Sequence, residues 1–199
     1  MATPAQMAGT LLRRVSETLA AELGGIQYTS SLTVNLGYDQ SVRAALPPGF
    51  GFLIPRSEGK RMLAATFVHN KFPHRAPDNR ALLRCFIGGA RNEQALQASD
   101  EEVIRIVRED LHQIIGLQAD PLFTRVYRWK GAMAQYGVGH LECLQRIETL
   151  LQRLPGLALA GNGYRGIGVP DCIRSGSEAA NKALLAIGLS QVTPQALTR

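Results

Sequence analysis

Alternation of apolar and polar positions predicts β-strands over much of the first two thirds of the chain. Ile26 to Tyr38 alternates and is rich in β-branched side chains, as half-buried strands are. Phe50 to Pro55 and Met62 to Val68 flank the turn Ser57-Glu58-Gly59-Lys60, which predicts a hairpin. Ala81 to Ile87 predicts a further strand. Three strands that follow one another so closely predict an antiparallel sheet.

Apolar residues three and four positions apart predict helices elsewhere. Ser99-Asp100-Glu101-Glu102 is a capping box, and the helix that it opens should end at Gly116. A strand over Leu122 to Trp129 follows, and Leu141 to Leu154 predicts an amphipathic helix. Ser16 to Leu23 predicts a shorter helix near the start of the chain.

The C-terminal part concentrates glycines between two apolar segments. Leu157 to Ala160 predicts a short strand, glycines follow within 161–168, and a helix is predicted from about Pro170 to Leu189. Closely spaced glycines let backbone N–H groups approach a ligand, and the following helix directs its positive end toward the same place. We interpret this stretch as a cradle for an anion or a cofactor. A glycine turn that joins strand to helix without a ligand is the alternative.

The hexapeptide Gly161-Asn162-Gly163-Tyr164-Arg165-Gly166 matches the pattern G-x-G-x-x-G. A dinucleotide fingerprint also requires a helix that opens within the glycines and a second parallel strand with an acidic residue about 20 positions further on. Here Gly168 and Pro170 postpone the helix, and no second strand is predicted after it. The match alone therefore does not predict a dinucleotide site.

Composition excludes several classes of protein. The chain has 199 residues, of which 45% are hydrophobic, enough for one domain with a core or for part of a larger protein. It has no run of eighteen apolar residues and no secretion signal after Met1, so we expect a soluble, cytoplasmic protein. Cys85, Cys143 and Cys172 are odd in number and widely spaced, which predicts reduced thiols.

Charge and histidine spacing exclude two further kinds of site. The formal net charge is +6, but the basic residues are scattered and no nucleic-acid module is recognisable, so no nucleic-acid partner is expected. A basic surface equally suits an anionic small molecule or an anionic membrane face. The four histidines lack the spacing of metal ligands, so no metal site is predicted.

The order of elements predicts an α+β fold, in which an antiparallel sheet with covering helices is followed by strand, glycine turn and helix. Such a closing unit normally belongs to a nucleotide-binding layer, yet no earlier βαβ unit supplies the other strands of that layer. The chain therefore resembles part of a larger fold.

Three motifs carry a family resemblance. Gly49 to Glu58, Ala134 to His140 and Ala160 to Gly176 together resemble the C-terminal half of oxygen-dependent protoporphyrinogen/coproporphyrinogen oxidases, flavoenzymes of the flavin-containing amine-oxidoreductase superfamily. Ala2-Thr3-Pro4-Ala5 resembles a loop of their flavin domain, so the resemblance covers nearly the whole chain. The family usually has proline in place of Ala134, and its N-terminal Rossmann unit and helical membrane-binding insert have no counterpart here.

The resemblance implies an organisation and a set of site residues. Residues 1–25 would be a remnant of the flavin domain with a connecting helix, 26–130 the substrate-domain sheet and helix, 131–190 the segment that contacts FAD, and 191–199 a tail. The residues implied to bind FAD are Trp129, Gly161, Asn162, Gly166, Ile167, Gly168, Val169 and Pro170. Those implied to face the tetrapyrrole are Phe50, Gly51 and Leu53. No catalytic residue is assigned.

The function implied by the resemblance is the FAD-dependent oxidation of protoporphyrinogen IX or coproporphyrinogen III to the porphyrin in haem biosynthesis, with O2 as acceptor. Because the chain resembles only the C-terminal half, we expect it to be N-terminally truncated and to bind flavin weakly or not at all when alone. The alternative is a non-catalytic tetrapyrrole- or partner-binding module. A separate chain that supplies the Rossmann half, and a peripheral membrane contact in the full-length enzyme, are left open.

Overall fold

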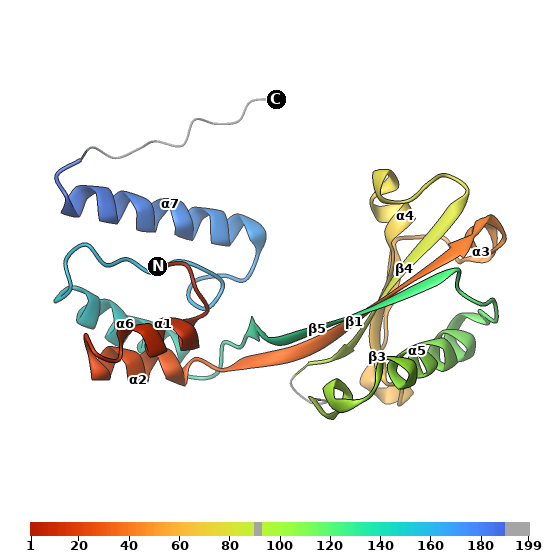
Figure 1. The fold of residues 1–199 in the computed structure, drawn as a ribbon, viewed down its shortest axis with the longest axis horizontal. Helices are drawn as coiled ribbons and strands as arrows, with labels where there is room; N and C mark the ends of the chain where they lie inside the picture. Colours follow the sequence, from red (N-terminus) through yellow and green to blue (C-terminus); the bar gives the residue numbers. More distant parts are fainter. Residues whose placement is uncertain (90–92, 190–199) are drawn as a thin grey trace. The chain divides into compact units, whose positions relative to one another are not determined.

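The computed structural model describes residues 1–89 and 93–189. The chain divides into two units, of which the first combines Met1–Tyr28 with the chain from Met133 onward and the second is Thr29–Ala132 (Figure 1). Each unit is described by itself.

The second unit is built on a five-stranded sheet with the order β2-β3-β4-β1-β5. Its strands are β1 (Tyr28–Asp39), β2 (Gly51–Leu53), β3 (Met62–Phe67), β4 (Arg80–Gly88) and β5 (Phe123–Ala134). The pairs β2–β3, β3–β4 and β4–β1 are antiparallel. Leu122 N–H donates to Gly37 O and Gly131 N–H donates to Ser30 Oγ, so β5 also runs opposite to β1. The predicted antiparallel sheet and the α+β class are confirmed.

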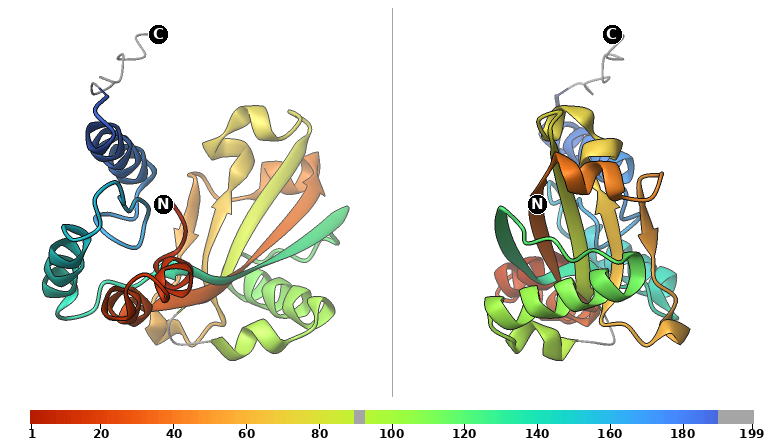
Figure 2. Two further views of the ribbon diagram at one scale, coloured as in Figure 1. Left: turned by 60° about the vertical axis from the view of Figure 1, so that its left-hand side comes forward. Right: turned by 90° about the vertical axis from the view of Figure 1, so that its right-hand side faces the viewer.

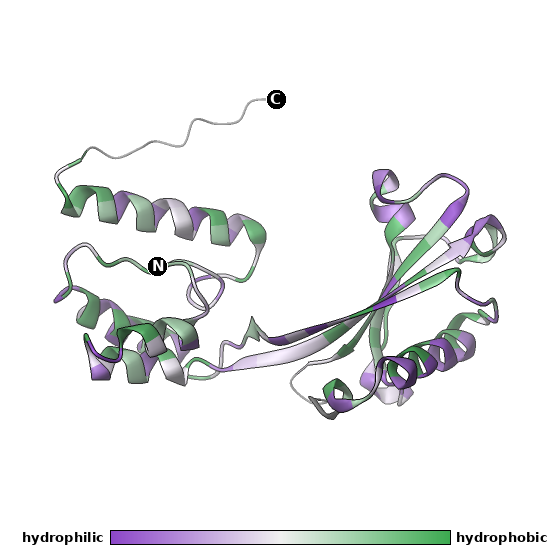
Figure 3. Ribbon diagram, in the orientation of Figure 1, coloured by the Kyte–Doolittle hydropathy of each residue, from purple (hydrophilic) through white to green (hydrophobic). Residues whose placement is uncertain are grey.

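Helix α5 (Asp100–Ile115) covers one face of this sheet. It begins as the capping box predicts, because Ser99 Oγ accepts a hydrogen bond from Glu102 N–H at 3.2 Å, and it ends at Gly116. Figure 3 shows the apolar and polar stripes of the helix. The apolar stripe packs on alternate residues of β1, β3 and β4, and the fully buried members of this core include Val103, Val107, Leu111, Leu32, Val34, Leu36, Leu83 and Cys85. This packing fixes which strand residues face away from the helix.

Short helices complete the second unit. They are α3 (Gln40–Ala45), α4 (Val68–Lys71), η1 (Arg56–Glu58), η2 (Pro73–Arg75) and η3 (Glu93–Gln97). Helix α3 is capped by Asp39, whose Oδ1 accepts hydrogen bonds from Ser41 N–H at 2.9 Å and Val42 N–H at 3.4 Å. The sequence pattern did not predict this helix.

The first unit is helical (Figure 2). It contains α1 (Ala5–Leu12), which the sequence pattern did not predict, α2 (Glu17–Gly25), α6 (His140–Leu151) and α7 (Val169–Ala186). Buried side chains of α1, α2 and α6 form its core with Tyr164. Helix α7 is amphipathic but has no buried residue.

The strand predicted at Leu157 to Ala160 is not formed. This segment instead lies beside the first residue, where Met1 N donates to Ala158 O at 2.7 Å and Ala160 N–H donates to Met1 O at 2.9 Å. That alternation of donor and acceptor is typical of parallel neighbours. A single paired residue is too short to define a strand, which explains the difference from the prediction.

Among the described residues, no helix is long and apolar enough to span a bilayer. In the same part of the chain, no group of three or more His, Cys, Asp or Glu side chains has the arrangement of a metal site. Cys85, Cys143 and Cys172 are all free thiols.

Candidate functional site

The glycine loop, residues 161–168, is held in place by the motif that precedes α6. Tyr136 Oη donates a hydrogen bond to Asn162 O at 2.8 Å, and His140 Nε2 donates to Tyr164 O at 2.8 Å. The Tyr136 and His140 rings stack on each other with their centroids 4.1 Å apart. Two of the motifs that carry the family resemblance are therefore in direct contact.

Several glycines of this loop are required by packing within the fold. A Cβ on Gly163 would lie 2.4 Å from the Tyr28 hydroxyl oxygen, and one on Gly166 would lie 2.4 Å from the Asp171 carboxyl carbon. A Cβ on Gly168 would also be close to the Asp171 side chain, at 3.0 Å from its Oδ2. Gly161 differs, because nothing lies within 4 Å of its Cβ position. Only part of the glycine pattern therefore leaves open space for a ligand.

Helix α7 begins directly after this loop. Its N-cap is Gly168, which has no side chain to bond the first N–H groups, and the exposed fractions of Ile167, Val169 and Ile173 lie between 62% and 73%. Asp171, in the first turn, forms an ion pair with Arg174. The start of the helix thus combines partial positive charge with exposed apolar side chains.

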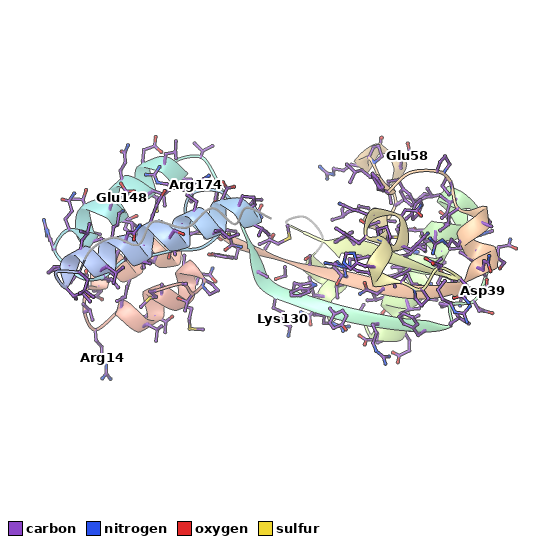
Figure 4. All side chains as sticks on the ribbon, turned by 90° about the horizontal axis from the view of Figure 1, so that it is seen from above. Arg14, Asp39, Glu58, Lys130, Glu148 and Arg174 are labelled. Atoms are coloured by element: carbon purple, nitrogen blue, oxygen red, sulfur yellow. The ribbon has the colours of Figure 1, made fainter. Side chains whose placement is uncertain are left out.

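A groove of about 550 Å³ separates α6 from α7 within the first unit. Its lining is mixed, with Leu144 and Ile147 on the apolar side and charged residues that include Glu148 and Arg174, both labelled in Figure 4. Because acidic and basic side chains both line it, the groove shows no preference for a ligand of one charge.

The second face of the sheet, opposite α5, carries two neighbouring rows of side chains. The strand register places Leu53, Ala64, Phe86 and Thr33 in one row and Gly51, Thr66, Arg84 and Asn35 in the next. Trp129 extends the first row onto β5, since its Nε1–H donates to Thr33 Oγ1 at 3.0 Å. Leu53 is 83% exposed and Trp129 is 49% exposed. This face therefore combines an apolar row with a more polar one.

Gly51 is required by the hairpin itself. Its φ is +136°, and an added Cβ would lie 2.1 Å from Ala65 O on the neighbouring strand. Its neighbour Phe52 turns to the opposite face, where its ring packs edge-on against Phe67 at a centroid distance of 6.1 Å. Phe50 is exposed before the strand begins. The three residues predicted to face a tetrapyrrole therefore have different local environments, and Leu53 is the one that extends the apolar row.

Comparison with known proteins identifies the class. The model of the family of flavin-containing amine oxidoreductases matches residues 1–184, so the chain belongs to that family. The family resemblance predicted from the three motifs is confirmed, and flavin is the cofactor that the family description names.

Two of the curated relatives that the chain matches are porphyrinogen oxidases. The chain is 35% identical over 165 residues to the coproporphyrinogen III oxidase of Bacillus subtilis, an alignment that covers 82% of this chain and 35% of that protein. It is 31% identical over 192 residues to the chloroplastic protoporphyrinogen oxidase of Nicotiana tabacum, covering 92% and 35%. A crystal structure of an Exiguobacterium protein assigned as a protoporphyrinogen oxidase matches with a TM-score of 0.77 and 29% identity, over 94% of this chain and 39% of that one. The chain thus spans about a third of the length of the curated relatives that it matches.

Sequence reasoning missed two kinds of site residue. Tyr136 and His140 act on the glycine loop from more than twenty residues away, and the sequence did not indicate that contact. Arg84 and Phe86 could have been found, because alternation along β4 places them opposite the buried Leu83 and Cys85.

Proposed function

We propose that this chain provides part of an FAD-dependent porphyrinogen oxidase, which converts protoporphyrinogen IX or coproporphyrinogen III to the porphyrin with O2 as acceptor. In this proposal residues 1–25 and 131–190 belong to the flavin layer and residues 26–130 to the substrate domain. The identity to porphyrinogen oxidases of two kinds supports the reaction class. A polypeptide that supplies the rest of the fold is part of the proposal.

The observation that carries the proposal is the contact between the motif around Tyr136 and the glycine loop. It holds the backbone of the loop at Asn162 and Tyr164, and Gly166, Ile167 and Gly168 lead from there into the first turn of α7, where Val169 and Pro170 lie. The exposed apolar side chains there suit the faces of a flavin ring, and Gly161 and Asn162 would line the same loop. The residues present therefore fit the cofactor.

Each surface would make a separate contribution. FAD, when bound, supplies the two-electron acceptor for the oxidation. The partial positive charge at the start of α7 would stabilise negative charge on the ring edge by roughly 0.3–2 kcal/mol. On the sheet, Leu53, Phe86 and Trp129 would pack against the apolar faces of the macrocycle and exclude water. Phe50 and Gly51 would border this apolar surface. We also keep Trp129 as a candidate flavin contact.

The test is complementation. The chain is co-expressed with the N-terminal two thirds of the Bacillus subtilis relative, and the purified complex is scanned for bound flavin and assayed for porphyrin fluorescence with coproporphyrinogen III and with protoporphyrinogen IX. We expect both signals, and little flavin on the chain alone. A complex that holds flavin but oxidises neither porphyrinogen would refute the proposed reaction.

A matched pair of variants locates the flavin. Val169→Asp replaces an exposed apolar side chain at the helix start with a charged one, so it should lower the flavin content of the complex by removing an apolar contact with the ring. Val15→Asp, at another exposed valine of the same unit, should leave the flavin content unchanged. Equal flavin content in the two variants would exclude the start of α7 as the binding site.

A non-catalytic tetrapyrrole-binding module is the second candidate. The apolar row on the sheet supports it, because that row lies within the second unit and involves no residue of the glycine loop. Porphyrin binding by the chain alone, together with failure of the complex to oxidise porphyrinogens, would favour this alternative.

A further inference from the structure

Arg84 occupies the centre of the second sheet face. It lies on β4, the middle strand of the sheet, with Thr66 and Asn35 as its register partners on the neighbouring strands. Its Nε–H donates to Asn35 Oδ1 at 3.0 Å, which fixes the direction of the guanidinium group. Alternation along β4 places Arg84 on the same face as Phe86 and opposite the buried Cys85.

Within the described part of the chain, no carboxylate forms an ion pair with Arg84. Among the ion pairs of the described residues, seven arginines pair with a carboxylate, and Arg84 is not one of them. It is also half-buried, so its guanidinium has lost part of its hydration. An amide such as Asn35 satisfies one donor without balancing the charge. The position therefore favours an anion.

The surroundings of Arg84 specify the kind of anion. The apolar row that contains Leu53, Phe86 and Trp129 lies two residues along the strands from the row that contains Arg84, a distance of about 7 Å. A ligand that suits both rows has a broad apolar body and a carboxylate at its edge. Inorganic phosphate would leave the apolar row uncovered.

We infer that Arg84 determines substrate specificity by binding a propionate carboxylate of the tetrapyrrole. This inference rests on the proposed function and deepens it. Arg84 does not touch the reacting carbon atoms; it anchors the edge of the macrocycle while the apolar row holds its face. Tetrapyrroles with more propionates offer this anchor in more orientations, so coproporphyrin III should bind more tightly than protoporphyrin IX.

The test uses the fluorescence of Trp129, the single tryptophan of the chain. The full chain is titrated with coproporphyrin III, with protoporphyrin IX and with coproporphyrin III tetramethyl ester, which keeps the ring but lacks the charges. We expect the free acid to bind at least about tenfold more tightly than the ester, as a charge-assisted contact implies. Coproporphyrin III should also bind more tightly than protoporphyrin IX.

Three variants assign the effect to Arg84. Arg84→Gln should weaken binding of the free acid about tenfold or more and leave ester binding unchanged. Arg84→Lys changes the local packing but keeps the charge, so it should keep most of the preference for the free acid. Arg105→Gln, on the helix that covers the opposite face, should behave as the wild type.

The outcomes separate two failures. If porphyrins bind but Arg84→Gln affects acid and ester equally, or neither, the role of Arg84 is refuted and the proposed function stands. If Arg84→Lys loses the preference as Arg84→Gln does, charge is not the cause and the inference is also wrong. If no porphyrin quenches Trp129 in the wild type, both the inference and the proposed substrate surface fail.

Discussion

The carboxylate of Asp110 should be the most sensitive polar group in the sheet unit. Asp110 lies on α5 and is only 3% exposed, and its Oδ2 accepts hydrogen bonds from the N–H groups of Arg61 at 2.9 Å and Met62 at 2.8 Å. These bonds join the covering helix to the start of β3. Because β3 pairs with β2, they also support the hairpin that presents Leu53.

The magnitude follows from those two bonds. A hydrogen bond to a charged group contributes roughly 1.5–3 kcal/mol, and a buried donor left without a partner carries a similar penalty. Asp110→Ala removes both bonds at once, so we expect the free energy of unfolding to fall by about 3–5 kcal/mol. Asp110→Asn keeps an oxygen in the same place and loses only the charge, so about 1–2 kcal/mol should be lost.

Urea unfolding followed by Trp129 fluorescence measures this effect, because the single tryptophan lies on β5 of the same unit. The control is Glu109→Gln, one residue earlier on α5, where an exposed carboxylate pairs with Arg61 and Arg105. Exposed ion pairs contribute little, so this variant should change the unfolding midpoint far less. The reasoning would be wrong if Asp110→Ala were no more destabilising than Glu109→Gln, or if Asn were no better than Ala at position 110.

Three further perturbations test the glycine loop and one buried histidine. Tyr136→Phe removes the hydroxyl that holds the loop and should lower the free energy of unfolding by about 1 kcal/mol, measured by urea titration, and reduce flavin retention in the complemented complex. Gly163→Ala should destabilise the first unit by about 1–3 kcal/mol, because the added methyl group clashes with the Tyr28 hydroxyl. Gly24→Ala, in open space within α2, should instead stabilise the unit by about 0.5–1 kcal/mol, and thermal unfolding would measure both changes. Burial lowers the pKa of His69, so the folded state resists protonation of this side chain. The free energy of unfolding should therefore have its full value above about pH 6.5 and fall as the pH drops below it. His69→Gln should remove that difference between urea titrations at about pH 7.5 and about pH 5.5.

The elements that the sequence predicted well are those specified by neighbouring residues. Helix α5 has a cap, an apolar stripe and a terminal glycine within one continuous segment, so its start at Asp100 and its end before Gly116 follow from local chemistry. The hairpin of β2 and β3 is equally local. The position of β1 between β4 and β5 depends on contacts between distant strands, which alternation alone does not encode.

Predictions failed where structure depends on a distant partner. Leu157 to Ala160 has the composition of a strand, but a strand requires a neighbour, and its backbone partner in this structure is the single residue Met1. Helix α1 is short and gains its burial from α2 and α6, so its own sequence gives little signal. The contact of Tyr136 and His140 with the glycine loop joins segments that no periodicity connects.

The glycines of the loop have a role in packing that the sequence did not indicate. The interpretation of the glycines within 161–168 as a cradle for a ligand stays a prediction, and in the structure Gly163, Gly166 and Gly168 also lie against the side chains of Tyr28 and Asp171. Their absence of side chains serves the internal packing of the loop. A packed loop is rigid, and rigidity is what a helix N-terminus needs if its partial charge is to act on a bound ring without reorganisation. Gly163, which is not among the proposed cofactor contacts, can therefore support a cofactor without touching it, and a substitution there should reduce flavin binding only through the loss of loop stability.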